Sequence, residues 1–301
     1  CRAVSNAAWI TVETGPVTGN GSFNYTVAPN AWKVSRLGSI TFEGISLEIF
    51  QDFIPRIVNV SAASYGFGLN GPQEAIAAGS IVAMFGNELA SSTVAATSQP
   101  LPYELAGTTV TIKDSFGAEK PAPLFFVSPG QINYLAPDGL AAGYGTVTVT
   151  SGGRTQTSGI RIAPVTPGLF SANADGDGVP AGVLVRVKPD GTQSYEPVAE
   201  FNQQTGRFIP RLIEFGPDQN EQLYLILFGT GIRNLATLKK VAVRHSQGSA
   251  EALYAGQQGD FAGLDQVNIQ LTRQMVNFGQ VYILLDVEGQ MSNRLQIEFK
   301  R

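Results

Sequence analysis

The sequence predicts an all-β protein made of three tandem immunoglobulin-like β-sandwich domains, the last two of which form an internal repeat. Charged residues make up only 15% of the 301 residues, while glycine (34) and proline (17) are frequent. This mixture is typical of short strands joined by tight turns. The apolar fraction of 43% is large enough for sizeable cores, and the length suits several domains. We expect domains of residues 1–54, 55–164 and 165–301.

The repeat consists of four motifs that recur in the same order. They are 85–89, 109–112, 131–133 and 145–149 in the first copy, and 228–232, 241–243, 266–268 and 279–283 in the second. Only the loops differ in length, so we expect two copies of one β-unit. The third motif places a glutamine and an asparagine two residues apart, which predicts that both amides lie on one face of a strand. We expect these amides to be buried and to satisfy backbone groups, with a binding role as the alternative.

The first 54 residues predict a smaller sandwich. Residues 8–12 and 23–27 have the pattern of strands, and Phe23, Tyr25 and Val27 share one face in the second. Residues 39–42 and 47–50 flank Glu43-Gly44, which predicts a hairpin.

This segment resembles a BACON domain, a small sandwich of bacterial surface and secreted proteins. The motifs that carry the resemblance are residues 3–12, Gly19-Asn20-Gly21, residues 25–30, residues 36–40 and Phe50-Gln51. Cys1, the only cysteine, falls where the family often has a cysteine, and Arg2 stands where a tryptophan follows it. Family members carry about one more strand before this cysteine. The resemblance therefore implies that the first domain, as given, lacks its first strand.

The chain after about residue 55 resembles the uncharacterised C-terminal domain of secreted acidobacterial proteins. The resemblance rests on residues 57–65, 78–86, 122–133, 166–170, 254–256, 261–268 and 292–293. It implies a fold and an extracellular location, but no function. Residues 198–217 depart from the pattern and predict an insertion.

Turn residues and apolar runs predict the strands of the second repeat. Lys188-Pro189-Asp190-Gly191 predicts a hairpin turn, and Gln203-Gln204-Thr205-Gly206 predicts another. The apolar run of residues 223–228 predicts a strand buried on both faces, and residues 295–299 predict a terminal alternating strand.

Three positions are candidates for ligand contact or chemistry. Asp175 and Asp177 lie two apart in a glycine-rich loop, which suits calcium, although a plain Asp/Gly turn is the alternative. Trp32 lies in a predicted loop between Asn30 and Lys33, where its ring would stack on a sugar or a partner, or pack locally. His245 is the only histidine, and no nucleophile motif accompanies it, so we expect a surface or loop histidine and no catalytic residues. We expect no cofactor other than this candidate calcium.

Charge and the missing strand guide the functional prediction. The net charge of −4 without a basic run excludes a nucleic-acid partner, and no apolar stretch is long enough to predict a membrane span. A sandwich without one strand exposes its core and an unpaired edge, which a strand from another chain can complete. The apolar residues Leu295, Ile297 and Phe299 are our candidate donor strand.

The sequence thus predicts a non-enzymatic extracellular surface protein that forms a homo-oligomer or filament by strand addition. The alternatives are a glycan-binding or adhesion module, and an accessory region of a larger secreted protein.

Overall fold

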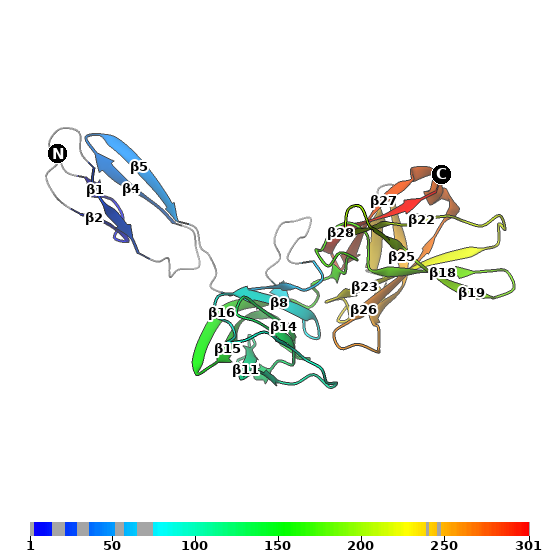
Figure 1. Cartoon of the computed structure of the whole chain (residues 1–301), viewed down its shortest axis with the longest axis horizontal. Coiled ribbons are helices and arrows are strands. Elements are labelled where there is room, and N and C mark those ends of the chain that lie inside the picture. The colour runs from blue at the N-terminus through cyan, green and yellow to red at the C-terminus, as the bar shows by residue number, and fades with distance from the viewer. Residues whose placement is uncertain are drawn as a thin grey trace. The chain divides into compact units, whose positions relative to one another are not determined.

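We describe the protein from a computed structural model. The structure describes residues 3–13, 22–28, 36–51, 57–64, 75–238, 241–245 and 248–300. The chain divides into two compact units, residues 1–56 and residues 57–301 (Figure 1). The first boundary lies two residues beyond the predicted one. The second predicted boundary, between residues 164 and 165, runs inside the second unit.

The first unit is a small two-layer β-structure. One antiparallel sheet has the order β1 (Val4–Ser5), β4 (Arg36–Phe42) and β5 (Ile45–Gln51), and the other pairs β2 (Ile10–Val12) with β3 (Tyr25–Val27). Glu43 and Gly44 join β4 to β5 with φ of 50° and 78°, which is the left-handed geometry of a tight hairpin turn. The predicted hairpin is confirmed. Among the described residues of this unit, Ala3, Ile10 and Ile40 form the buried core.

The first repeat is a sandwich of two sheets. One sheet has the order β6 (Ile57–Ser61), β8 (Ile81–Gly86), β14 (Gln131–Leu135), β13 (Leu124–Val127) and β9 (Val94–Ala95). The other has the order β10 (Glu104–Leu105), β11 (Thr108–Lys113), β15 (Gly143–Ser151), β16 (Arg154–Ile162) and β7 (Ala75–Ile76), with β12 (Glu119–Pro121) beside β11. Taken in chain order, this is the A-B-E-D against G-F-C arrangement of immunoglobulin-like domains. The short β7 adds to the last strand in parallel.

The second repeat has the same strand order. One layer contains β17 (Gly168–Leu169), β23 (Gln222–Thr230), β26 (Asp265–Leu271) and β25 (Gly248–Gln257). The other contains β24 (Val241–His245), β27 (Gln280–Val287), β28 (Gln290–Phe299) and β22 (Leu212–Ile213), which again adds in parallel. Here β24 also pairs with β25, so the two layers are hydrogen-bonded into one continuous sheet. The 3-10 helix η2 (Arg273–Phe278) connects β26 to β27.

The four repeated motifs fall on equivalent strands. Phe85-Gly86 ends β8 and Phe228-Gly229 lies near the end of β23, while the other three motifs lie on β11, β14 and β15 and on β24, β26 and the start of β27. In both copies the glutamine Nε2 of the third motif donates to the asparagine Oδ1 at 2.8 Å. The shared face is therefore confirmed. The expected role is wrong, because these half-buried amides bond to each other and not to backbone groups.

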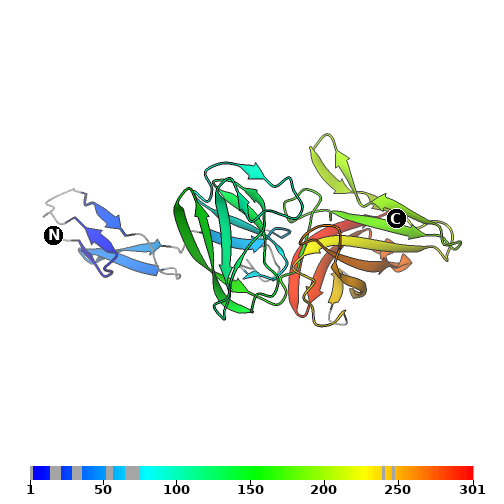
Figure 2. The same ribbon diagram turned by 90° about the horizontal axis from the view of Figure 1, so that it is seen from below.

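An insertion between β17 and β22 distinguishes the second repeat from the first. It forms one hairpin from β18 (Gly182–Val187) and β19 (Gln193–Pro197), which extends the sheet beside β23. A second hairpin of β20 (Ala199–Asn202) and β21 (Arg207–Pro210) forms a separate ribbon (Figure 2). Both predicted turns are confirmed, with Gly191 at φ 82° and Gly206 at φ 65°. The insertion begins earlier than the predicted residue 198.

Strand β23 is less buried than the sequence predicts. Leu223, Leu225 and Leu227 are fully buried in the core of the second repeat. The alternate residues are half-buried. The apolar run therefore has one core face and one partly covered face.

Hydrogen bonds between the two repeats hold them in one unit. The Ile81 backbone amide donates to Thr230 Oγ1 at 2.8 Å, and Asn234 Nδ2 donates to the Ala78 carbonyl at 2.6 Å. At Gly263, which has φ of 75°, an added Cβ would lie only 2.5 Å from the Ile81 side chain. This close approach requires a glycine.

Candidate functional site

Strand β5 has apolar side chains that lie on the core side of the first unit but remain exposed. Its residues Leu47 and Ile45 pair with Ile40 and Phe42 of β4, respectively. Residues directly opposite in an antiparallel pair share a face. Ile40 is buried at 1% exposure, yet Ile45 is 74% exposed and Leu47 is 46% exposed. We call Ile45 and Leu47 the uncovered β5 face.

The second layer packs most tightly on the other end of this sheet, around Gly38. A Cβ added at Gly38 would lie 2.7 Å from Ile10 and 2.8 Å from Trp9, both from the β2 layer. Arg36 closes the same end, since its guanidinium stacks on Trp9 at 4.3 Å and donates to the Ala28 carbonyl at 2.6 Å. Core packing is therefore tight around Gly38. Nearer the turn, Phe42 of β4 packs against Phe23, while its neighbours Ile45 and Leu47 on β5 stay exposed.

The outer face of the hairpin is also partly apolar. Leu37 and Phe50 are directly opposite each other and are 61% and 67% exposed. Within the described residues, β5 pairs with β4 on one side only. An edge strand with unpaired backbone groups and exposed apolar side chains is a template for pairing with another strand.

The predicted calcium residues form a turn that anchors the insertion. The carboxylate of Asp175 accepts from Ser171 Oγ at 3.0 Å and from the Asp177 amide at 3.2 Å, and it forms an ion pair with Arg207. Burial alone would raise the pKa of Asp175, but the hydrogen bonds from Arg207, Asp177 and Ser171 lower it. Asp177 is exposed. In the described part of the chain, no group of three or more His, Cys, Asp or Glu side chains is arranged to hold a metal ion. This geometry favours the plain turn.

The candidate donor strand lies in the core of its own domain. Leu295, Ile297 and Phe299 are 1%, 1% and 2% exposed and belong to the core of the second repeat. Their strand β28 pairs with β27 along its length and with β22 at its end. Donation of this strand would require it to leave that core. Its role as a donor stays a prediction.

Two residues singled out by the sequence, Trp32 and Cys1, lie outside the described residues. His245, which the sequence predicted to be a surface or loop histidine, is the last residue of strand β24. It is half-buried, and this burial lowers its pKa.

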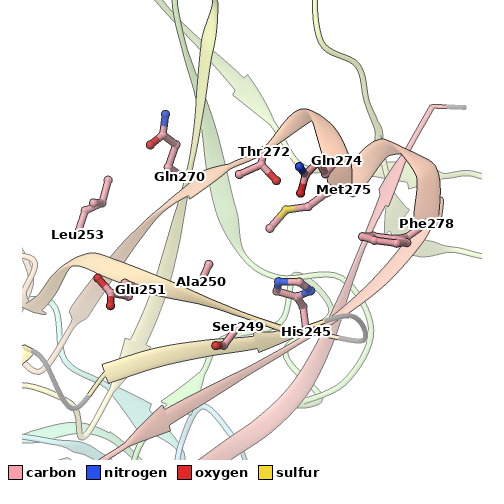
Figure 3. Close-up of a pocket in the computed structure, with 11 residues that line it drawn as sticks. His245, Ser249, Ala250, Glu251, Leu253, Gln270, Thr272, Gln274, Met275 and Phe278 are labelled. Atoms are coloured by element: carbon pink, nitrogen blue, oxygen red, sulfur yellow. The ribbon is translucent and has the colours of Figure 1, made fainter.

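His245 lines a pocket that the sequence did not predict. The cavity has a volume of about 480 Å³ and lies between the β24–β25 hairpin and η2 (Figure 3). Its described lining combines polar and apolar side chains: His245, Ser249, Glu251, Gln270, Thr272 and Gln274, with Ala250, Leu253, Met275 and Phe278. In Figure 3 the imidazole points toward the helix that carries Met275 and Phe278. The N-terminus of the helix has no side-chain cap, because Thr272 makes no capping hydrogen bond. No sequence signal therefore marked this site.

A buried ion pair stabilises the second repeat near its contact with the first. Asp265 is fully buried and accepts from Arg233 Nε at 2.7 Å and from the Ile232 amide at 2.7 Å. Every hydrogen bond of this carboxylate is made within the repeat, which suits a structural role.

Comparisons with known proteins add little to these observations. No family model matches the chain, and no curated protein sequence matches it. Within the residues that the structure describes, no helix has the length and apolar character needed to cross a membrane.

Two solved structures of immunoglobulin domains resemble the chain weakly. Domains A168–A170 of titin are 10% identical over 99% of this chain and 85% of that chain, with a TM-score of 0.18. The eight N-terminal Ig domains of Down Syndrome Cell Adhesion Molecule are 8% identical over 100% of this chain and 52% of that chain, with a TM-score of 0.15. Similarity at this level carries no argument about function. The immunoglobulin-like assignment rests on the strand order within each repeat.

Proposed function

We propose that this chain is a non-enzymatic structural protein of the cell surface, whose first unit accepts a β-strand from a second copy of the chain. The observation that carries the proposal is the uncovered β5 face, in which Ile45 and Leu47 lie on the core side of a sheet but are 74% and 46% exposed. The extracellular location rests on the resemblance to secreted proteins that the sequence motifs carry.

Strand addition would pair the free backbone edge of β5 and cover its exposed apolar side chains. The incoming backbone would pair with the free edge of the strand, and its alternate side chains would cover Ile45 and Leu47. The low charge content of the chain, 15%, places few like-charge penalties on contacts between copies. A donor from the next copy, added head to tail, does not close on itself and gives a filament.

The second unit suits a stiff spacer in such an assembly. Its two repeats share hydrogen bonds such as that from Ile81 to Thr230, and they pack closely at Gly263. A spacer needs this continuity between domains because a flexible joint would not fix the spacing of the subunits.

The test compares assembly of two variants that introduce the same charge on opposite faces of β5. Wild-type chain at micromolar concentration should form filaments in negative-stain electron microscopy. Leu47→Lys should abolish the filaments, because it places a charge on the uncovered β5 face, which the incoming strand would cover. Ser46→Lys, on the outer face, should leave the filaments intact. Both positions are exposed, so both variants should fold, which circular dichroism checks.

Two results would refute the proposal. The first is a wild-type chain that stays monomeric in light scattering at every concentration. The second is assembly of Leu47→Lys at the wild-type level.

A further inference from the structure

The charges that line the pocket of the second repeat disfavour anionic ligands. Glu251 is the one carboxylate in the described lining, and none of the described lining residues is Lys or Arg. The two arginines nearest in sequence to the lining are held elsewhere. Arg244 binds Asp286 at 2.6 Å, and Arg273 donates to the Gly216 carbonyl at 3.0 Å and stacks on Phe215. Without a cation, the pocket disfavours phosphate, sulfate and carboxylate ligands.

The polar groups of the lining match hydroxyl groups. Gln270 and Gln274 each offer an amide donor and acceptor, and Ser249 and Thr272 offer hydroxyls. The Thr272 hydroxyl is not used to cap η2. Burial lowers the pKa of His245, which favours its neutral imidazole.

Apolar surface completes the site. Met275 is buried, Phe278 is half-buried, and Leu253 is 54% exposed at the rim. A pyranose ring presents an apolar face of C–H groups and a rim of hydroxyls, which matches an aromatic or aliphatic floor with amides around it. A concave site with a few convergent polar groups is the usual form of a small-molecule site.

We propose that this pocket binds a neutral oligosaccharide, with Gln274, His245 and Thr272 contacting its hydroxyls and Phe278 and Met275 contacting its C–H face. The site depends on η2, which is absent from the equivalent connection of the first repeat. There, residues 136–142 form a described turn without a helix, and Lys120 Nζ donates to the carbonyls of Asp138 and Gly139. The second repeat thus carries the site, and the first repeat is the same scaffold without it.

The test uses the full chain and four neutral probes: cellohexaose, maltohexaose, xylohexaose and mannohexaose. Hexagalacturonate is the acidic counterpart. Saturation-transfer NMR detects weak binding, and isothermal titration gives the affinity. At least one neutral probe should bind, and hexagalacturonate should not.

Variants locate the binding in the pocket. Ser249→Trp fills the cavity and Gln274→Ala removes an amide, so each should weaken binding about tenfold or more. Gln204→Ala changes an exposed glutamine in the β20–β21 turn and should bind like wild type. If the tryptophan variant misfolds, Gln274→Ala alone still shows whether the oligosaccharide binds in this pocket. Leu47→Lys should also bind normally, so failure of assembly and failure of this site are distinguishable.

The proposal is overturned if none of the four neutral probes binds. It is equally overturned if only hexagalacturonate binds, or if both pocket variants bind as tightly as wild type.

Discussion

The guanidinium of Arg233 and the carboxylate of Asp265 form an ion pair at 2.7 Å in which the carboxylate is completely buried. The same carboxylate accepts from the amides of Ile232 and Arg233 at 2.7 and 3.2 Å. It therefore fixes the turn after β23, next to the residues that contact the first repeat.

Asp265→Ala should lower the free energy of unfolding by about 3–5 kcal/mol, because it leaves a half-buried cation and two amides without their acceptor. Chemical denaturation followed by circular dichroism measures the change. Glu119→Ala breaks the exposed pair with Lys113 at 3.2 Å and should cost less than about 1 kcal/mol. Equal effects of the two variants would contradict a structural role for Asp265.

Thr230→Val should weaken the contact between the repeats. Its buried hydroxyl accepts from the Ile81 amide and donates to the Gly263 carbonyl at 2.8 Å. The variant leaves a part-buried amide and a buried carbonyl without this partner, which should cost about 1–3 kcal/mol for the buried group. Differential scanning calorimetry should show the unfolding transitions of the two repeats moving apart. The matched variant Thr155→Val, on the exposed pair with Thr150, should leave the profile unchanged.

Asp175→Ala should loosen the β20–β21 ribbon without unfolding the sandwich, and the Asn173–Phe208 hydrogen bonds should keep the ribbon attached. The variant removes the ion pair with Arg207 while the sheets keep their own hydrogen bonds. Hydrogen exchange at residues 199–210 should become faster, and exchange in β27 should not change. Calcium should not slow exchange in the wild-type chain. A calcium-dependent slowing would instead restore the metal site that the loop sequence suggested.

Ile297→Ala tests what the C-terminal strand does. Its side chain is 1% exposed, so truncation should cost about 2–5 kcal/mol of stability. Gln296→Ala, on the other face of the strand, should stay within about 0.5 kcal/mol. If Ile297→Ala removed filaments without a loss of stability, the strand would act in another subunit and not in its own core.

Asp114 should make the fold sensitive to acid. The amide of Ala141, together with those of Ala118 and Phe116, lowers the pKa of this carboxyl below its ordinary value of 3.8. A carboxyl whose pKa is lower in the folded state stabilises that state at pH values above its pKa in the unfolded chain. This stabilisation is lost as the pH falls through the pKa of the folded state. Asp114→Asn should therefore melt at a lower temperature than wild type at neutral pH. The two melting curves should converge at about pH 2; a constant difference would show that the charge is irrelevant.

Local signals predicted much of the fold. The turn at Glu43-Gly44 and the turns ending at Gly191 and Gly206 were found because each contains a glycine, the residue that most readily adopts the positive φ of a tight turn. The internal repeat was found because four motifs recur in the same order in the sequence, and each of them lies on an equivalent strand in both sandwiches. These features depend on a few neighbouring residues, which a sequence displays directly.

The sites depended on contacts that a sequence does not display. Leu47 alternates like a core residue, and only the extent of the second layer decides that it stays exposed. Asp265 meets Arg233, which lies 32 positions earlier in the chain, and the pocket arises where η2 passes over the β24–β25 hairpin. The Gln–Asn pairs were placed on the right face, but their mutual hydrogen bond needed the side-chain conformation.

The insertion has a simple attachment. The Asn173 side chain donates to the Phe208 carbonyl and accepts from the Phe208 amide, both at 2.9 Å, and so takes the place of a neighbouring strand. The inserted hairpins leave after β17 and return before β22, and the strand order of the sandwich is the same as in the copy that lacks them. Evolution can therefore lengthen, shorten or exchange this segment without redesigning the domain that carries it.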